Sequence, residues 1–503
     1  MKHKLAALLF FTFLIYISGF SQTDQIGRIE IDLSDEWDDF FVVPMQDKGI
    51  ILGSFGEKDK GITPVKFIWY DANLQEQNTQ TIQIPKTYEY VGSYNGLVAS
   101  FTLFYDFRKG KYIAAKCEYG STSVEELEGA IADDMYVKSF VVLDNTMFAL
   151  LNDKKKASIS IIDLENGSEK RVELHEDKQR IEAINIQLVQ PGSEVHVFYH
   201  SCKDDCQNLI KRFDKTGNEI KSDLQVKSKG KDYVMNVTSA KVSNDRTFVI
   251  SAYGKRSDRA ASGFMVGLYD NTSKASFTQQ YNFLELEHFT DYLPDYMKKL
   301  IERKQAKKEK KGEELEIDYL MQLHEVRQLP DNQYLVAGEF YYATYRYETR
   351  TVYTNGVAST QTQSVFDGYQ YTHSLLAVFD DAGQKVWSNI FPMYLDQKPF
   401  KARKNLRITT EDNQIQCLYA NFTSVNSITF ENGEIVKDKG KEKLLPANEG
   451  EKIRSAYNTD IVFWYPSHFL VSGYQKIVTE KTDGAKKKKR RVFFLTDVIY
   501  EGE

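Results

Sequence analysis

HEVRQLPDNQYLVAGEF at residues 324–340, with SLLAVFDDAGQKVWSNIFP at residues 374–392, is the stretch that decides the fold. Each piece holds two apolar runs of strand length, separated by a turn sequence, Pro-Asp-Asn in the first and Asp-Asp-Ala-Gly in the second. Together they describe a unit of four strands. Similar units recur about eight times, at a period of roughly 45–50 residues. This repetition predicts an all-β fold of the β-propeller type.

The units account for nearly the whole chain after its amino-terminal segment. The last unit ends after three strands, whereas GRIEIDL at residues 27–33 is a strand without a unit. A ring of sheets has to close or leave a strand edge exposed. We therefore predict that residues 28–33 supply the outer strand of the last unit, in a single domain covering residues 22–503. We count eight units, with seven as the alternative, at residues 40–84, 88–131, 136–174, 184–226, 235–283, 324–392, 404–439 and 460–500.

Glycine turns give the repeat its regularity. They follow the third strand of four units, at Asn166-Gly167, Thr216-Gly217, Ala382-Gly383 and Asn432-Gly433. Such turns need positive φ angles, which Gly and Asn adopt at low cost. A preceding carboxylate can accept hydrogen bonds from the turn, and we expect this of Glu165, Asp214, Asp380 and Asp381. Calcium binding is the alternative, although the spacing of an EF-hand loop is absent.

Residues 291–317 interrupt the repeat with a predicted helix. Pro294 suits a first helical turn, Asp291 or Asp295 lies at the positive end, and Gly312 can end the helix. We expect an apolar stripe in the first half to dock on the ring. Lysines at the far end predict either a basic contact site or a plain charged surface. The stripe is Tyr296, Met297, Leu300 and Ile301, and the lysines are Lys307, Lys308, Lys310 and Lys311.

Residues 341–373 form a second insertion, predicted as a long hairpin around Asn355-Gly356. It is too long for an ordinary connection. Its tyrosine rings offer rigid contact area with a polar tip. They predict either a binding surface or packing of the hairpin on neighbouring blades. The tyrosines are Tyr342, Tyr345, Tyr347, Tyr353, Tyr369 and Tyr371.

The overall charge is weakly negative, at −6, so no global field favours nucleic acid. The strongest basic run is KKKKRR at residues 486–491, between two predicted strands of the last unit. We expect a solvated hairpin tip there. Binding to an anionic polymer or a lipid headgroup is the alternative.

The amino-terminal segment predicts export. Two lysines precede an apolar run at residues 5–20, and Gly19 and Ser21 are the small residues before a cleavage point. This is the pattern of a signal peptide, so we expect residues 1–21 to be removed. A retained membrane anchor is the alternative, but the run is short for a span of about 20 residues. We expect an extracytoplasmic protein, whether periplasmic, cell-surface or secreted.

The chain has four cysteines. Cys202 and Cys206 flank a turn in HSCKDDCQN, and an oxidising compartment favours a disulfide between them. A metal half-site is the alternative, but no pair at ligand spacing completes it. Cys117 and Cys417 fall in strand-like runs, where buried packing is expected.

The unit at residues 324–392 also carries a recognisable pattern. Its members are Asp331, Tyr334, Val336, Ala337 and Gly338, followed by Phe379, Asp380, Gly383, Val386 and Trp387. This resembles the DGGYIVAG and DANGNVLWSK repeat of uncharacterised secreted bacterial β-propellers, and more distantly the blades of quinoproteins. The resemblance implies the fold and an extracytoplasmic setting. It carries over no catalytic residue.

Catalytic motifs are absent from the sequence: HExxH, GxxxxGK[ST], GxSxG and sialidase-type Asp boxes do not occur. We therefore predict a binding or scaffolding module without cofactor or metal. Its expected partner is a protein or polysaccharide of the cell envelope, not nucleic acid. The alternative is a propeller enzyme, a hydrolase, lyase or dehydrogenase, with its site at the central channel. A calcium-stabilised structural protein is the third possibility.

Overall fold

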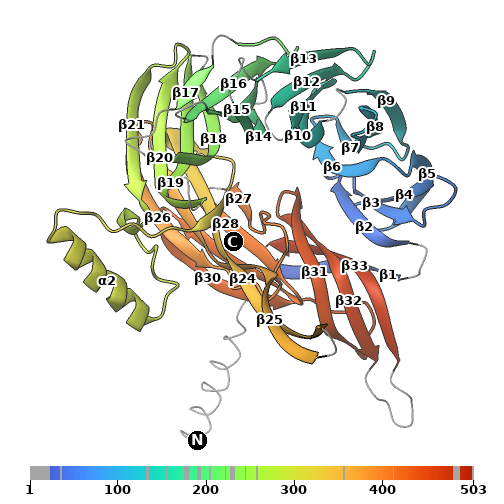
Figure 1. Ribbon diagram of the computed structural model, residues 1–503. Coiled ribbons are helices and arrows are strands. Elements are labelled where there is room, and N and C mark those ends of the chain that lie inside the picture. Colours follow the sequence, from blue (N-terminus) through green and yellow to red (C-terminus); the bar gives the residue numbers. More distant parts are fainter. Residues whose placement is uncertain are drawn as a thin grey trace, which may run out of the picture.

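The computed structural model describes residues 23–33, 37–131, 135–153, 156–174, 180–189, 194–202, 206–220, 223–226, 233–243, 245–255, 259–354, 357–411, 413–479 and 488–500. Within them the chain forms eight antiparallel sheets set around a central opening (Figure 1). Each sheet corresponds to one predicted unit. The fold is therefore an all-β, eight-bladed propeller, as predicted, and the seven-bladed alternative is wrong.

The four strands of each blade follow one another from the central opening outwards, and we call them A to D. Blade one holds β2 (Trp37–Pro44), β3 (Ile50–Gly56), β4 (Ile62–Tyr70) and β5 (Glu76–Pro85); blade two, β6 (Glu89–Asn95), β7 (Ala99–Asp106), β8 (Lys111–Glu118) and β9 (Glu125–Ala130). Blade three holds β10 (Tyr136–Leu143), β11 (Thr146–Asn152), β12 (Ala157–Asp163) and β13 (Glu169–Glu173); blade four, β14 (Arg180–Val189), β15 (Glu194–Cys202), β16 (Cys206–Asp214) and β17 (Leu224–Val226).

The second half of the ring follows the same order. Blade five holds β18 (Tyr233–Ser243), β19 (Arg246–Lys255), β20 (Ala260–Asp270) and β21 (Ala275–Asn282); blade six, β22 (Leu320–Leu323) with β23 (Arg327–Leu329), then β24 (Gln333–Thr354), β25 (Val357–Phe379) and β26 (Lys385–Pro392). Blade seven holds β27 (Arg407–Glu411), β28 (Gln414–Asn421), β29 (Ser424–Glu431) and β30 (Glu434–Lys443); blade eight, β31 (Glu451–Tyr465), β32 (His468–Thr479), β33 (Lys489–Tyr500) and β1 (Thr23–Asp32). Short 3-10 turns occur at Phe283–Glu285 and Pro330–Asn332.

The amino-terminal strand closes the ring. β1 pairs antiparallel with β33 and becomes strand D of blade eight, which confirms the prediction for residues 28–33. Charges help to hold this seam, because Arg490 of β33 forms ion pairs with Glu30 and, at 2.7 Å, with Glu451 of β31. The first and last described strands therefore belong to one sheet.

This seam changes the interpretation of the basic run at residues 486–491. Residues 486 and 487 lie outside the described part of the chain, and Lys488 is exposed. Arg490, however, turns toward the carboxylates of β1 and β31. The expectation of a wholly solvated tip is wrong for Arg490, since its charge is matched within the ring.

Apolar side chains fill each of the eight interfaces between neighbouring blades. Every buried cluster is made by residues of two consecutive blades, and one of them joins blade eight to blade one. At that seam Phe40 stacks on Phe493, with ring centroids 4.4 Å apart. Trp464 Nε1 donates a hydrogen bond to the Gly49 carbonyl at 2.8 Å. The packing is thus continuous around the ring.

Three of the glycine turns receive a side chain from the preceding blade. Gly433 lies against Trp387, where a Cβ atom on the glycine would come within 2.9 Å of that side chain. Gly383 lies against Phe277 and Gly217 against Ile161 in the same way. Each glycine carbonyl also accepts a hydrogen bond from the preceding blade, donated by Asn389 (2.9 Å), Tyr281 (2.8 Å) and Lys170 (3.1 Å) respectively. These contacts join neighbouring blades at their outer strands.

Carboxylates cap these turns, as predicted for Asp214 and Asp380. Asp380 accepts hydrogen bonds from the amides of Ala382 at 3.0 Å and Gln384 at 2.8 Å. In blade three the capping carboxylate belongs to Asp163, and the prediction for Glu165 is wrong. The position that begins the turn is the one whose short side chain reaches the following amides.

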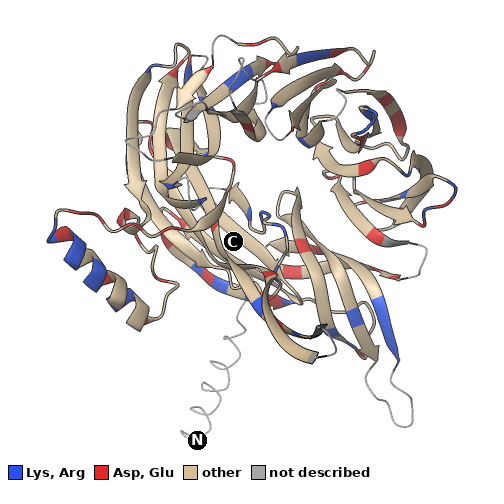
Figure 2. Ribbon diagram, viewed as in Figure 1, with Lys and Arg blue, Asp and Glu red and all other residues tan. Residues whose placement is uncertain are grey.

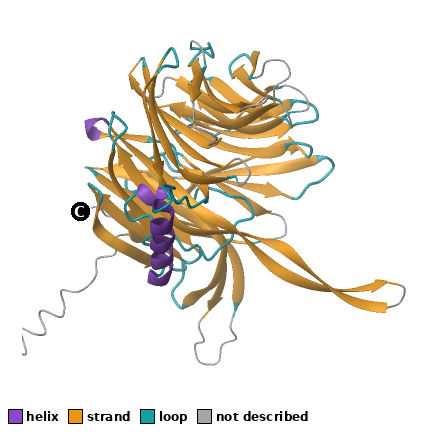
Figure 3. Ribbon diagram, turned by 60° about the vertical axis from the view of Figure 1, so that its left-hand side comes forward, coloured by secondary structure: helices purple, strands orange, loops and turns teal. Residues whose placement is uncertain are grey.

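The two faces of the ring differ in their connections. Because consecutive strands are antiparallel, A–B and C–D turns lie on one face, and B–C turns and D–A connections lie on the other. The first, which we call the turn face, carries short turns such as residues 380–384. The second, which we call the elaborated face, carries both insertions. These are α2 (Asp295–Glu309), within the connection from β21 to β22, and the long hairpin at the ends of β24 and β25, which Figure 3 shows projecting from the ring.

Candidate functional site

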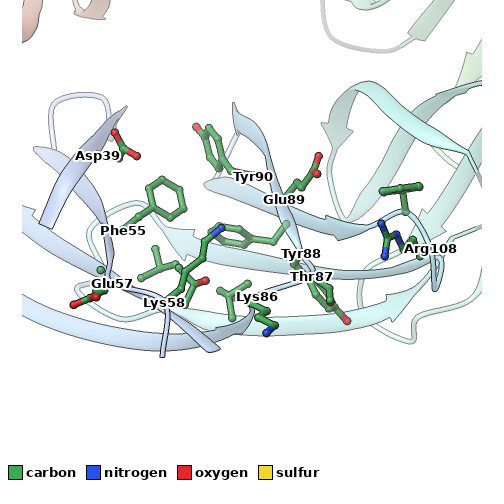
Figure 4. Close-up of a pocket in the computed structure, with 16 residues that line it drawn as sticks. Asp39, Phe55, Glu57, Lys58, Lys86, Thr87, Tyr88, Glu89, Tyr90 and Arg108 are labelled. Carbon is green, nitrogen blue, oxygen red and sulfur yellow. The ribbon is translucent and has the colours of Figure 1, made fainter. Parts of the chain in front are cut away.

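A cleft of about 750 Å³ opens on the elaborated face between blades one and two (Figure 4). Its walls come from the starts of β2, β4 and β6 and from the ends of β3, β5 and β7. Hollows of this size hold small ligands in many proteins. Sequence reasoning did not single out this cleft, because its residues are spread over six strands and carry no motif.

Aromatic rings form the floor of the cleft. Tyr90 is 39% exposed and stacks on Phe41 at a centroid distance of 5.0 Å. Phe55 meets Tyr90 edge-on at 5.7 Å, and Phe104 lies 6.1 Å from it. Burial raises the pKa of the Tyr90 phenol, so its hydroxyl stays protonated and can donate a hydrogen bond. The floor can therefore bury an apolar group and still offer a polar tip.

Charged side chains surround this floor. Asp39, Glu57 and Glu89 supply carboxylates, and Lys58, Lys86 and Arg108 supply cations. All six residues are exposed. The signs balance, so the cleft as a whole does not select an anion or a cation.

A buried carboxylate braces the wall formed by blade two. Asp106 accepts hydrogen bonds from Thr87 Oγ1 at 2.7 Å and from the Arg108 amide at 3.1 Å. Although burial alone would raise it, these bonds hold the pKa of Asp106 below its usual value. These hydrogen bonds link the connection between β5 and β6, which contains Thr87, to the turn between β7 and β8, which contains Arg108.

The hairpin of blade six extends from the ring as a two-stranded arm, which we define as residues 342–370 (Figure 3). Tyr342, Tyr345 and Tyr347 are 52%, 61% and 79% exposed. Their position is consistent with the predicted binding surface. The Tyr353 side chain lies outside the described residues.

The other two predicted tyrosines pack inward. Tyr371 is fully buried between blades six and seven, where its hydroxyl donates to the Arg403 carbonyl at 2.6 Å. Tyr369 is half-buried against Tyr341 and Phe366. The proposed contact role is wrong for Tyr371, because the chain has already returned from the arm to the buried part of the blade at this residue.

The helix α2 stands away from the blades, and Figure 2 shows basic residues along it. Its N-terminal Pro294, first-turn Asp295 and terminal lysines agree with the sequence expectation. The expected docking is wrong, because none of its residues is buried and Tyr296 is 73% exposed. Lys307, Lys310 and Lys311 are exposed, and Lys308 forms an ion pair with Glu313 at 2.5 Å.

The segment before α2 anchors the insertion instead. Phe283 and Phe289 are buried in the cluster between blades five and six. Tyr292 stacks on His373 at the root of the arm, with centroids 3.8 Å apart. The aromatic spacing of residues 283–292 is the signal that could have revealed this anchor.

Buried histidine–carboxylate pairs come closest to a catalytic arrangement. His324 Nε2 lies 2.7 Å from Glu339 Oε1, and the same carboxylate accepts the amides of Asn405 and Leu406 at 2.9 Å. Burial opposes the ionised form, but these bonds lower the pKa of Glu339, and burial lowers the pKa of His324. His196 is held similarly, with one ring nitrogen 2.8 Å from Ser239 and the other 3.2 Å from Glu194. Both pairs brace the ring.

The cysteines show two environments. Cys202 is disulfide-bonded, and the strand register sets it opposite Cys206. The Cys206 side chain lies outside the described residues, so the pairing stays a prediction. Cys117 and Cys417 are buried and free, as expected, and burial raises the pKa of Cys117 to about 12.

Two features are absent from the described residues. No three His, Cys, Asp or Glu side chains among them are grouped so as to hold a metal ion. None of their helices has both the length and the apolarity needed to cross a membrane.

Comparison with known proteins finds no sequence match and distant structural similarity. No family model and no curated protein matches the chain. Among solved structures it is similar to cobalt-substituted apocarotenoid oxygenase of Synechocystis, at 8% identity and a TM-score of 0.31, over 48% of this chain and 63% of that one. It is also similar to hydrazine synthase of Kuenenia stuttgartiensis, at 9% identity and a TM-score of 0.36, over 67% and 76% of the two chains. The match spans less than two thirds of the oxygenase chain.

Proposed function

We propose that the protein is an exported β-propeller that binds a protein or polysaccharide of the cell envelope through its elaborated face. One observation carries the proposal: the cleft and the arm belong to the same face, and the connection that contains α2 starts and ends on it. A rigid ring that gathers its irregular segments on one side suits binding, because function resides in segments grafted onto a scaffold. The amino-terminal pattern and the resemblance of blade six to secreted propellers support export.

Binding through the arm is tested with two matched variants of the mature chain. One replaces Tyr345 and Tyr347 of the arm by Ser. The other replaces Ile435 and Val436 of β30, each 45% exposed, by Ser. Co-sedimentation with washed envelopes, and with their separated protein and polysaccharide fractions, measures the affinity. We expect the arm variant to bind about tenfold more weakly and the β30 variant to bind normally. Equal binding by both variants would contradict the proposal.

Export is tested separately by mass spectrometry of the amino terminus. A processed chain that begins at Gln22 in the extracytoplasmic fraction is the expected result. An intact amino-terminal segment on a cytoplasmic protein would contradict it.

A further inference from the structure

The carboxylates of Asp39 and Glu89 lie at the inner end of the cleft, and the cations lie further out together with Glu57. Asp39 of β2 and Glu89 of β6 belong to innermost strands, so they lie nearest the central opening. Lys58 and Arg108 lie in B–C turns, and Lys86 follows the outermost strand of blade one. Figure 4 shows Asp39 and Glu89 toward one edge of the cleft and Lys86 toward the opposite edge.

These charges are available to a ligand. None of Asp39, Glu89, Lys58 and Lys86 forms a side-chain ion pair with another described residue, and all four are exposed. Glu57 also lies at the outer end, but the cations there outnumber it. A bound molecule with a cation at the inner end and an anion at the outer end would therefore meet complementary charge at both.

The middle of the cleft favours an apolar group of the ligand. Phe55 and Phe104 lie at the ends of the second strands, between the inner carboxylates and Lys86, and Tyr90 lies beside Glu89 at the inner edge (Figure 4). An aromatic or aliphatic side chain placed there would lose contact with water and gain ring contacts. Neutral sugars could use the same floor, but they would leave both charged ends unmatched.

We propose that the cleft binds a short peptide segment in which a basic and an acidic residue flank an aromatic or aliphatic one. The inference rests on the proposed binding function and names the ligand of one site on the elaborated face. The basic side chain faces Asp39 and Glu89, and the acidic one faces Lys58 and Lys86. An extended chain advances about 3.3 Å per residue, so three to five residues bring all three groups within a cleft of this size.

Four blocked peptides test the charge pattern on the mature full-length chain. They share a central Phe, flanked by Lys and Asp, by two Lys, by two Asp, or by Gln and Asn, and isothermal titration calorimetry measures their affinities. We expect the Lys-Phe-Asp peptide to bind about tenfold more tightly than each of the others. Equal affinities, or a neutral oligosaccharide that binds where no peptide does, would overturn the proposal.

Paired variants show whether the named residues recognise the charged side chains of the peptide. Asp39→Asn with Glu89→Gln should abolish the preference for Lys-Phe-Asp over the doubly acidic peptide. Lys58→Met with Lys86→Met should abolish the preference over the doubly basic peptide. The control, Glu434→Gln with Lys443→Met on β30, should leave the order of the four peptide affinities unchanged. If the order of the peptide affinities is unchanged in both cleft variants, the peptide proposal is wrong. The proposed function would still hold if envelope binding depends on the arm.

Discussion

The turn face and the elaborated face differ in how closely their segments pack against the ring. On the turn face, Gly433 is so closely covered by Trp387 that a single added carbon would collide with it. On the elaborated face, α2 buries no residue and the arm presents Tyr345 and Tyr347 to solvent. The difference teaches that contacts between blades stabilise the ring, whereas α2 and the arm leave side chains exposed that can contact other molecules.

The most damaging change to the ring should be removal of its closing strand. Deletion of residues 23–33 leaves β33 as an open edge and takes Glu30 away from the partly buried Arg490. We expect the cooperative thermal transition to disappear, as followed by circular dichroism, with aggregation seen in gel filtration. A synthetic peptide of residues 23–33 should restore part of the transition. A deletion variant that melts like the full chain would show that the seam is dispensable.

Two glycine substitutions separate the inter-blade contact from the cost of backbone conformation. Gly433→Ala meets Trp387 and has a φ of +88°, whereas Gly450→Ala, at a φ of +75°, meets no atom within 4 Å. We expect Gly433→Ala to lower the free energy of unfolding by about 3 kcal/mol and Gly450→Ala by about 1 kcal/mol, because only the first also overpacks an interface. Urea denaturation measures both. Equal losses would mean that the turn face does not join the blades as described.

Low pH should lower the stability of the region around His373, where the arm and the segment before α2 meet the ring. His373 is stacked between Phe340 and Tyr292, and burial lowers its pKa to about 3. The unfolded chain takes up this proton near pH 6.5, so the stability is complete above about pH 6.5 and falls as the pH drops toward 3.

The test is the comparison of His373→Phe with the natural chain. Phe keeps the stacking and has no proton to bind, so we expect about 2 kcal/mol less loss of unfolding free energy between pH 7 and 4.5. Urea midpoints at both pH values give this difference. The same acid sensitivity in both proteins would show that His373 does not titrate as described.

The smallest effect on stability should come from the arm itself. Residues 346–365 can be replaced by an Asn-Gly turn that joins Tyr345 to Phe366, which are paired across the hairpin. Since the removed side chains that the structure describes are mostly exposed, the unfolding free energy should change by less than about 0.5 kcal/mol. A large loss in the melting temperature would mean that the arm is part of the ring's own support.

Sequence reasoning succeeded where a local pattern recurs and failed where packing decides. The closing strand was visible because a repeat missing one strand needs a partner elsewhere. The inner strand of blade six was misplaced: β22 lies at Leu320–Leu323, before the predicted start at residue 324, and only the short β23 falls inside the unit. The docking of α2 was also wrong, because four apolar residues suggested a buried face that aromatic residues before the helix provide instead.

The amino-acid sequence by itself determined the repeated four-stranded units, the glycine turns, and the existence of one helical and one hairpin insertion, since these follow from local periodicity and backbone preference. Only the tertiary structure decided that both insertions share a face with the cleft, and that Asp39, Glu89, Lys58 and Lys86 surround one aromatic floor. Strand direction and the order of strands from the opening outwards set these positions, and both arise when the blades are arranged in a ring.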